Sequence, residues 1–252
     1  MSSVYVAASA LLSRVKEFGQ WSIASLLLKS GASGLEIRRE LLTELDKPLM
    51  QSDGFKNETD LHLVYSAPIP LWKEGRKLNE DIKDVLEEAN QLQCDLVKFS
   101  LGKYDLRESK LDDLKKLLSF ALLRNPNLTI TVENDQTSEG GRVDQILEFL
   151  IACEKASVPI FLTFDIGNWL FVHDDPHTAA SALHPFVRYI HVKHVEMQNG
   201  EFITSSIPSH LEGFYQELLM QLPSDVPRCI EFPISEEDVL PYLNHFVKFL
   251  SA

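Results

Sequence analysis

The sequence has few cysteines, a deficit of basic residues and no long hydrophobic run. Its three cysteines, Cys94, Cys153 and Cys229, are far apart and form no CxxC pair, which argues against a zinc knuckle or a disulfide framework. We therefore expect a reducing, cytoplasmic location. No stretch approaches the roughly 20 apolar residues of a membrane span, and residues 1–19 lack the basic leader and apolar core of a signal peptide. We expect no membrane partner.

Acidic residues outnumber basic ones, 37 to 24, which gives a formal charge of −13. A chain of this charge repels polyanions, so its composition argues against general nucleic-acid binding. Many cytoplasmic enzymes are acidic, and a local positive pocket for a phosphate is compatible with this overall charge. The composition thus favours a small-molecule partner.

The length of 252 residues matches the roughly 250 residues of one (β/α)8 barrel. Strand-like and helix-like segments alternate, which indicates a parallel sheet. The strands are expected at Val4–Ala7, Leu35–Arg38, Asp60–Ala67, Leu96–Leu101, Leu128–Glu133, Pro159–Asp165, Tyr189–Val192 and Arg228–Phe232. The helices are expected at Val15–Lys29, Glu40–Leu45, Asn79–Leu92, Ser109–Leu123, Val143–Ala156, Pro176–Leu183, Leu211–Leu222 and Glu236–Leu250.

These eight strand–helix units predict an α/β fold, a (β/α)8 TIM barrel that forms a single domain over residues 1–252. The structural rival is a doubly wound open sheet. That fold has fewer strands and usually a glycine-rich turn after the first strand, which this sequence lacks.

Alternate residues of a strand point to opposite faces. One phase collects large apolar residues, such as Leu35 and Ile37, and should face the outer helices. The other phase is polar or small and should face the barrel interior. Its charged and polar members are Glu36, Arg38, His62, Ser66, Lys98, Ser100, Thr131, Glu133, Thr163, Asp165, His191, Lys193 and Glu231. An interior without a function is filled with branched apolar side chains, and buried charge is costly unless it is paired or bound to a metal.

Four residues of the polar phase lie late in four consecutive strands: Glu133, Asp165, His191 and Glu231. Barrel enzymes place their sites at this C-terminal mouth. Three carboxylates and one imidazole suit Mn²⁺, Mg²⁺ or Co²⁺, with Zn²⁺ as a further candidate, and differ from thiolate-rich structural zinc sites. Each residue alone could instead be an ordinary ion pair or a cap, but their common phase and position favour one metal ion.

The chain resembles the xylose isomerase-like TIM barrels, which include sugar isomerases, ketose 3-epimerases, inosose dehydratases and endonuclease IV-type enzymes. The resemblance rests on the segments GLEIR, TVEND, FDIGNW, YIHVKH and IEFP, and it covers nearly the whole chain. It implies that Glu133, Asp165, His191 and Glu231 bind one divalent metal, and that Glu133 and Glu231 exchange protons with a sugar-like substrate. It also implies a homo-oligomer, since relatives commonly form dimers or tetramers.

A metal that chelates a carbonyl and its neighbouring hydroxyl acidifies the proton between them, and paired carboxylates can remove and return that proton. The expected function is therefore isomerisation or epimerisation of a small sugar or sugar derivative. A lyase that dehydrates a keto-polyol, of the inosose or dehydroshikimate type, is the alternative. A non-catalytic binding module on the same scaffold is the third hypothesis, which the retention of all four metal-type residues disfavours.

The chain departs from the family at one position. Many relatives carry histidine three residues after the aspartate, where this chain has Asn168; asparagine can hydrogen-bond a substrate hydroxyl but is a poor metal ligand. This difference and the acidic charge argue against DNA repair. We expect the substrate to contact Asn168, Lys193, Arg38, Glu36, Lys98, His62 and Trp169. For the charged residues of this set, pairing with neighbouring charges is the alternative, and Trp169 could instead pack beneath a loop.

Overall fold

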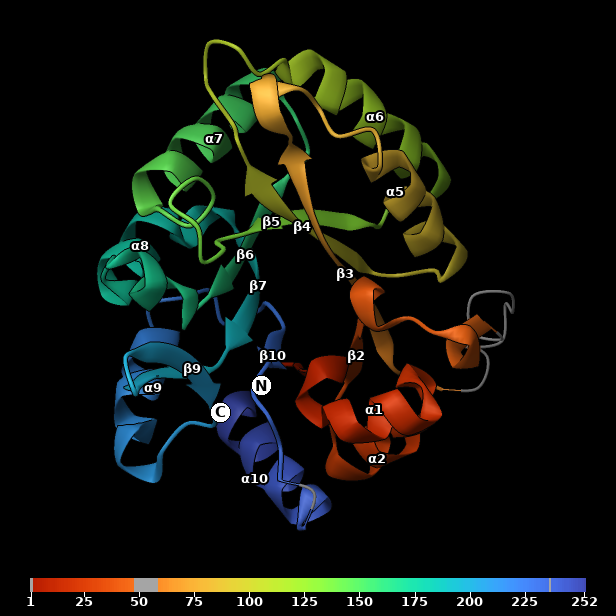
Figure 1. Ribbon diagram of the computed structural model, residues 1–252, viewed down its shortest axis with the longest axis vertical. Helices are drawn as coiled ribbons and strands as arrows, with labels where there is room; N and C mark the ends of the chain where they lie inside the picture. Colours follow the sequence, from red (N-terminus) through yellow and green to blue (C-terminus); the bar gives the residue numbers. More distant parts are fainter. Residues whose placement is uncertain (1, 48–58, 236) are drawn as a thin grey trace.

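The parallel strands of the protein form a closed barrel. A computed structural model describes residues 2–47, 59–235 and 237–252, and its parallel strands follow the order β1-β10-β7-β6-β5-β4-β3-β2 (Figure 1). They span Val4–Ala7 (β1), Gly34–Arg38 (β2), His62–Trp72 (β3), Leu96–Gly102 (β4), Thr129–Glu133 (β5), Phe161–Asp165 (β6), Val187–Val192 (β7) and Arg228–Ile230 (β10). The predicted (β/α)8 fold is confirmed.

Amphipathic helices surround the ring (Figure 1). They span Leu12–Phe18 (α1), Ala24–Ser30 (α2), Ile82–Gln91 (α5), Leu111–Arg124 (α6), Val143–Ala156 (α7), Pro176–Leu183 (α8), Glu212–Leu219 (α9) and Val239–Ser251 (α10). The predicted bounds of α7 and α8 are confirmed. At α8 the signals are strong, because the Asp175 side chain accepts a hydrogen bond from Thr178 N and a proline opens the first turn. The predicted start of the last helix, Glu236, lies outside the described residues.

The helix predicted over Val15–Lys29 is wrong in its centre. Gly19 has a positive φ of 79° and ends α1, and the 3₁₀ turn Gln20–Ile23 separates α1 from α2. The helix predicted over Glu40–Leu45 is also wrong, since the chain there forms only two 3₁₀ turns, Arg39–Leu41 and Glu44–Asp46. One contact explains both results: the buried Asp46 carboxylate accepts a hydrogen bond from Gln20 N at 2.7 Å, which draws the two segments together and breaks both helical periods.

Two strand features were not predicted. Strand β3 continues past Pro68 and Pro70 to Trp72, with a register shift against β4 between Ser66 and Pro70. A second, two-stranded antiparallel sheet, β8 (His194–Gln198) and β9 (Glu201–Ser205), follows β7. The sequence contains the signal for this hairpin, since Asn-Gly is a favoured pair in two-residue turns. Asn199 and Gly200 both have the positive φ that such a turn requires, 52° and 86°.

The interior phase of the strands was predicted well. One large apolar cluster lies between the strands and the helices, and it includes Leu35, Ile37, Val97 and Phe99. A separate small cluster fills the lower barrel interior, formed by Tyr5, Ala7, Val64, Leu96, Tyr189 and Cys229. The upper interior is therefore left to polar side chains. Among the described helices, none has the length and apolar character needed to span a membrane.

Candidate metal centre

The four predicted metal ligands converge at the C-terminal end of the barrel. Glu133 and Asp165 are the last residues of β5 and β6, His191 lies in β7, and Glu231 directly follows β10. These strands are consecutive neighbours in the ring. One ligand atom from each of the four residues lies within 4.8 Å of all the others. The topology therefore brings together side chains that are up to 98 positions apart in the sequence (133 to 231).

The atoms of this cluster face a common point. His191 Nδ1 lies 2.9 Å from Glu133 Oε1, 3.1 Å from Glu231 Oε2 and 3.8 Å from Asp165 Oδ2. Three of these atoms, on Glu133, Asp165 and His191, are buried and make no aligned hydrogen bond with the described residues. Lys193 Nζ lies 2.7 Å from Asp165 Oδ2, so ion pairing partly satisfies these buried atoms, and their shared orientation defines a point that suits a cation. Carboxylate oxygens and one imidazole nitrogen fit Mn²⁺, Mg²⁺ or Co²⁺.

Each carboxylate is held from behind by a different group. Lys98 Nζ donates to Glu133 Oε2 at 2.8 Å, and Arg38 donates to Glu231 Oε1 at 2.7 Å. Asp165 Oδ1 accepts hydrogen bonds from the backbone N–H groups of Gly167 and Asn168, at 2.9 and 3.0 Å. These contacts fix one oxygen of each carboxylate and turn the other toward the common point, as preorganised ligands require. In this structure Lys193 Nζ pairs there with Asp165 Oδ2 and Glu231 Oε2.

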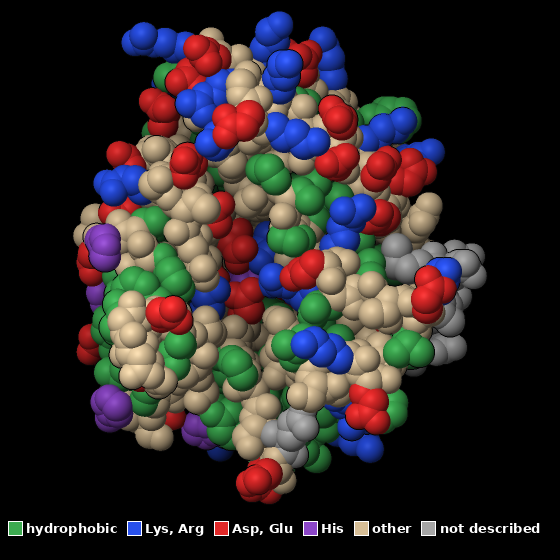
Figure 2. All heavy atoms as spheres, in the orientation of Figure 1, with side chains coloured by type: hydrophobic (Ala, Val, Ile, Leu, Met, Phe, Trp, Pro, Cys, Tyr) green, Lys and Arg blue, Asp and Glu red, His purple; other side chains and the backbone are tan. Residues whose placement is uncertain are grey.

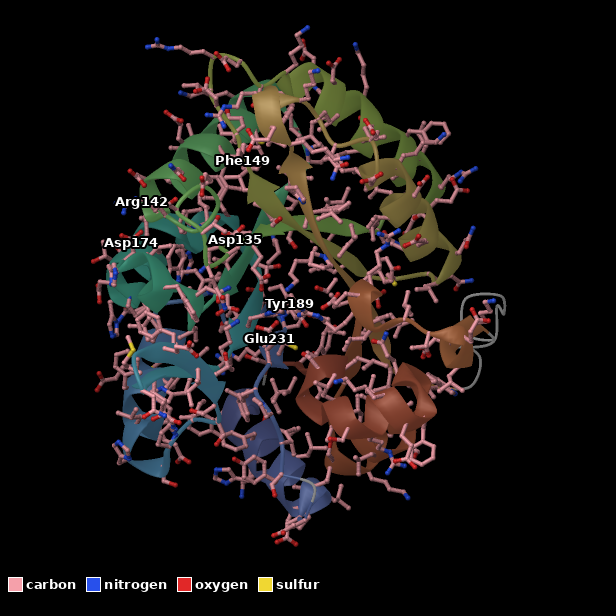
Figure 3. The ribbon with its side chains drawn as sticks, in the orientation of Figure 1. Asp135, Arg142, Phe149, Asp174, Tyr189 and Glu231 are labelled. Carbon is pink, nitrogen blue, oxygen red and sulfur yellow. The ribbon has the colours of Figure 1, made fainter. Side chains whose placement is uncertain are left out.

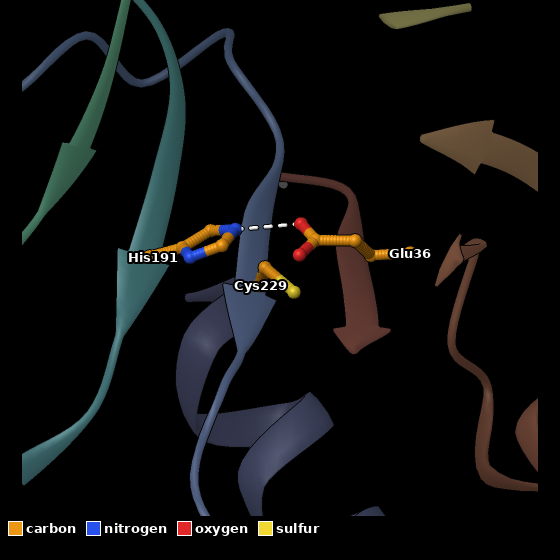
Figure 4. Close-up of side chains that lie close together, drawn as sticks. All are labelled: Glu36, His191 and Cys229. Carbon is orange, nitrogen blue, oxygen red and sulfur yellow. Dashed lines mark hydrogen bonds and ion pairs between the residues drawn. The ribbon is translucent and has the colours of Figure 1, made fainter. Parts of the chain in front are cut away.

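The imidazole of His191 is oriented by a fourth acidic residue, Glu36, which the sequence analysis assigned to the substrate. Glu36 Oε2 lies 2.6 Å from His191 Nε2, and both side chains are fully buried (Figure 4). This contact keeps a proton on Nε2 and presents Nδ1 to the carboxylates, since the hydrogen bond of one ring nitrogen sets the role of the other. Glu36 also contacts Arg38 at 3.1 Å and Lys98 at 3.7 Å.

The charges of the cluster balance one another. Four carboxylates, on Glu36, Glu133, Asp165 and Glu231, meet the cations Arg38, Lys98 and Lys193 and the imidazole of His191. The nitrogen–oxygen distances are between 2.6 and 3.8 Å. Pairing of this kind offsets the desolvation of buried ions.

The pKa values follow from burial set against these partners. Burial raises the pKa of Glu133, but Lys98 and His191 outweigh it and lower that pKa to about 2. Burial likewise opposes ionisation of Glu231, whose pKa is nevertheless held well below its usual range by His191 and Lys193. For Asp165 burial prevails, and with the neighbouring Glu231 and Glu133 carboxylates it raises the pKa to about 7 despite Lys193. Two glutamates of the cluster are thus ionised at neutral pH.

A second group with metal-ligand chemistry shares one member with the first. Glu36, His191 and Cys229 also place one ligand atom each within 4.8 Å of the others (Figure 4). Burial raises the pKa of the Cys229 thiol to about 12, and a protonated thiol is a weak ligand. Glu36 already uses an oxygen for His191. This group therefore supports the first cluster from below.

A cavity of about 370 Å³ lies directly over the cluster. Glu133 and Glu231 line it, together with Arg38, Lys98, Asn168 and Lys193. In the space-filling view, red and blue side chains gather in a hollow at the centre of the mouth (Figure 2), and Glu231 lies near the middle of the ring, with Asp135 farther out (Figure 3). The cavity is open enough for a small polar molecule and has charged groups on its floor.

Four of the expected substrate contacts line this cavity and three do not. Lys193 and Arg38 contact the carboxylates, with Lys193 Nζ 2.7 Å from Asp165 Oδ2 and 2.9 Å from Glu231 Oε2. Lys98 also lines the cavity, as does Asn168, whose Nδ2 donates to Asn134 O at 2.7 Å.

Glu36, His62 and Trp169 were expected to contact the substrate, but none of them lines the cavity. Glu36 lies beneath the cluster, as described above. His62 opens β3 at the opposite end of the barrel, where it pairs with Asp95 at 3.0 Å and stacks on Tyr5. The strand phase alone could not separate the two ends of the barrel. Trp169 is fully buried and packs against Phe164 with ring centroids 5.3 Å apart, so it supports the turn after β6 from behind.

The sequence analysis missed several residues of the site. The buried Asn134 side chain accepts a hydrogen bond from Asp165 N at 2.7 Å and donates one to Asp165 O at 2.9 Å, which ties the end of β5 to the end of β6. Its position directly after Glu133 was the available signal. The cavity is also lined by Ser66, Ser100, Asp135, Gln136 and Thr137, of which Ser66 and Ser100 were predicted only to face the interior.

Gly167 allows Lys193 to reach the cluster. Its backbone has ordinary helical dihedral angles, so its need for glycine comes from close packing. A Cβ at Gly167 would lie 2.7 Å from Lys193 Cγ and 2.8 Å from Val195 Cγ2, well inside van der Waals contact.

Comparison with known proteins agrees with this architecture. Across the whole chain, the structure is similar to a xylose isomerase domain containing protein from Salmonella typhimurium (11% identity, TM-score 0.74, covering 100% of this chain and 98% of that one). It is also similar to the probable 3-DHS dehydratase AsbF of Bacillus anthracis (12%, 0.66, 99% and 99%) and to an L-ribulose 3-epimerase (14%, 0.63, 100% and 95%). At these identities the likeness shows the fold.

Sequence comparison provides the family. No curated protein matches the sequence, but the family model described as xylose isomerase-like TIM barrel matches residues 29–214. That match covers most of the chain, including Glu133, Asp165 and His191. The chain therefore belongs to the xylose isomerase-like TIM barrel family.

Proposed function

We propose that this protein is a divalent-metal-dependent isomerase or epimerase of a small sugar or sugar derivative. The observation that carries the proposal is the convergence of Glu133, Asp165, His191 and Glu231, whose ligand atoms all lie within 4.8 Å of one another on the floor of the mouth cavity. Membership of the xylose isomerase-like TIM barrel family and the structural similarity to an L-ribulose 3-epimerase support it. Mn²⁺, Mg²⁺ and Co²⁺ are the favoured ions, and Zn²⁺ is compatible with the same donors.

The protein's own groups would then move the proton. Glu133, Asp165, His191 and Glu231 would hold a divalent ion, which would supply Lewis-acid activation of a C–H bond next to a substrate carbonyl. Glu133 and Glu231 come from β5 and β10, which two other strands separate, and both line the cavity. Ionised carboxylates on two sides of one cavity suit removal of a proton from one face of a carbon and its return to the other face, which is the requirement of epimerisation.

Three further side chains would orient the substrate. Lys98, Lys193 and Arg38 border the cavity with N–H groups, which suit the oxygens of a hydroxyl, a carboxylate or a phosphate. Asn168 also borders it, but its amide is engaged with Asn134 O and with the Gln136 side chain. We therefore assign Asn168 mainly to the shape of the cavity, and the cations to binding.

Chelation tests the metal requirement. Purified protein is treated with EDTA, dialysed and assayed against a panel of ketoses and keto-acids, first without metal and then with Mn²⁺ restored. We expect turnover to be lost and then recovered, and Glu133→Gln to remain inactive in both conditions. Turnover that continues at the same rate after complete chelation would contradict the proposal.

A lyase on the same site is the second candidate. The observation that favours it is Lys193, a buried ammonium on the cavity floor, which could protonate a hydroxyl as it leaves. Burial lowers the pKa of Lys193, but Asp165 and Glu231 outweigh it and hold that pKa above its usual range, so the proton is present at neutral pH. Reaction in D₂O separates the candidates by mass spectrometry: one deuterium exchanged into a product of unchanged formula indicates epimerisation, and loss of water indicates a lyase.

A further inference from the structure

The long strand β3 builds a wall beside the mouth. After its register shift, β3 remains paired with β4 beyond the barrel, with Pro70 opposite Ser100 and Trp72 opposite Gly102. Proline is tolerated at such an irregularity because it has no N–H to contribute. Gly102 has a positive φ of 70°, and a Cβ there would collide with Pro70 and with the carbonyl of Trp72. Glycine therefore lets the two strands approach closely enough to form the wall.

A second cavity, of about 540 Å³, lies against this wall. Pro70, Trp72 and Gly102 border it on the wall side, and the loop after β5 borders it on the other. Ser100, Asp135 and Thr137 line both this cavity and the one above the metal cluster. The two cavities are thus adjoining parts of one cleft, and Asp135 lies at their junction, at the rim of the mouth (Figure 3).

The second cavity differs from the first in character. Its walls are largely apolar, and hydrophobic side chains gather beside the central hollow on the side of β3 and β4 (Figure 2). The charged groups at its rim are paired with one another: Lys103 contacts Glu74 at 2.6 Å and Glu139 at 3.9 Å, and Lys73 contacts Asp81 at 3.2 Å. The cleft therefore has one charged half and one apolar half.

We propose that the second cavity is a subsite for an apolar arm, aryl or alkyl, of the same substrate whose polar sugar-like part lies over the metal cluster. This inference rests on the proposed function, and it narrows the substrate class to a sugar derivative with an apolar substituent. A bare sugar is covered mostly by hydroxyl groups, which lose hydrogen bonds to water against apolar walls. An aryl or alkyl group is transferred from water to those walls favourably. Among the described rim residues, Lys73 and Lys103 are already paired with acidic side chains, so they offer no free cation to an anionic substituent.

Matched glycosides test the subsite directly. Dissociation constants of methyl and phenyl β-D-xylopyranoside are measured by titration calorimetry with the Mn²⁺-supplemented protein. We expect the phenyl compound to bind at least tenfold more tightly, because the buried ring removes apolar area from water while ordering of the complex consumes part of that gain. Equal dissociation constants, within twofold, would overturn the inference.

A substitution that fills the second cavity tests whether the phenyl ring binds there. Glu139 is exposed at the rim of the second cavity and does not line the first, so Glu139→Trp should reduce the phenyl advantage to less than threefold. Glu154→Trp, on an exposed position of α7, is the matched control and should keep it at tenfold or more. A phenyl advantage that Glu139→Trp leaves intact would place the ring elsewhere and refute the subsite.

The two proposals fail separately. A phenyl advantage that Glu139→Trp removes, in a protein with no metal-dependent turnover, leaves the subsite supported and the proposed function refuted. Metal-dependent turnover without a phenyl advantage refutes the subsite alone.

Discussion

Replacing Glu36 with glutamine should weaken metal binding without any direct contact between residue 36 and the ion. Glu36 accepts a hydrogen bond from His191 Nε2 at 2.6 Å and contacts Arg38 and Lys98 at 3.1 and 3.7 Å. Glutamine keeps the shape and one acceptor oxygen but loses the charge. It can also turn its NH₂ group toward the imidazole, which favours the tautomer with the proton on Nδ1, where the ligand lone pair is needed.

The size of the effect follows from these contacts. Loss of a carboxylate that orients a metal-bound histidine typically costs about 10- to 100-fold in metal affinity. Glutamine retains an acceptor for Nε2–H, so we expect the lower part of that range, about 10- to 30-fold, which corresponds to about 1.4–2 kcal/mol. The Mn²⁺ dissociation constant is measured by titration calorimetry. The ¹⁵N shifts of the His191 ring report its tautomer independently of activity.

A neighbouring residue provides the control. Glu40 contacts the same Arg38 side chain at 2.9 Å but lies near the surface, with a side chain that is 38% exposed. Among its contacts with the described residues, none is with His191. Glu40→Gln should bind Mn²⁺ within twofold of the wild type. The reasoning is refuted if Glu36→Gln also binds within twofold, or if both variants lose affinity equally, since the effect would then pass through Arg38 alone.

Three further predictions concern the supports of the site. Asn134→Ala leaves the buried N–H and C=O of Asp165 without their side-chain partner, and urea denaturation should show a loss of about 2–4 kcal/mol; a loss below 0.5 kcal/mol would contradict the assigned clamp. Gly167→Ala forces Lys193 aside, and kcat/KM should fall about tenfold, whereas an unchanged value would exclude Lys193 from the reaction. Glu88→Gln should lower the free energy of unfolding at pH 7 by about 1–2 kcal/mol, because Glu88 binds Arg39 and accepts a hydrogen bond from Tyr65. Burial opposes ionisation of Glu88, but Arg39 and Tyr65 outweigh it and lower its pKa. The difference between variant and wild type should therefore be full above about pH 4.5 and shrink as the pH falls through the lowered pKa, and a difference that grows toward acid would reverse the assigned sign.

The sequence allowed the barrel and the convergence of four polar side chains to be predicted because two local patterns survive in the fold. Alternation along each strand separated interior from exterior, as the two clusters around Leu35 and Val64 show. The late position of Glu133 and Asp165 in their strands placed them at the mouth. Both signals depend only on the period of a strand and its direction.

Several wrong predictions fall where contacts between residues far apart in the sequence determine the local structure or the role of a side chain. The Asp46 carboxylate reaches back to Gln20 and ends helices that periodicity would continue. The error at His62 is of another kind: the residue has the interior phase, but it opens β3 and so lies at the opposite end of the barrel, as its early position in the strand indicated. The role of Glu36 could not be assigned, because its partner His191 is 155 positions away.

The ion pairing under the mouth has a consequence for biogenesis. Because Arg38, Lys98, Lys193 and His191 already neutralise the acidic groups there, the chain can complete its fold without the proposed metal. Small zinc domains behave differently, since they collapse only around their ion. Depletion of metal in the growth medium should then yield an intact, idle protein that is ready for activation, with little material lost to degradation.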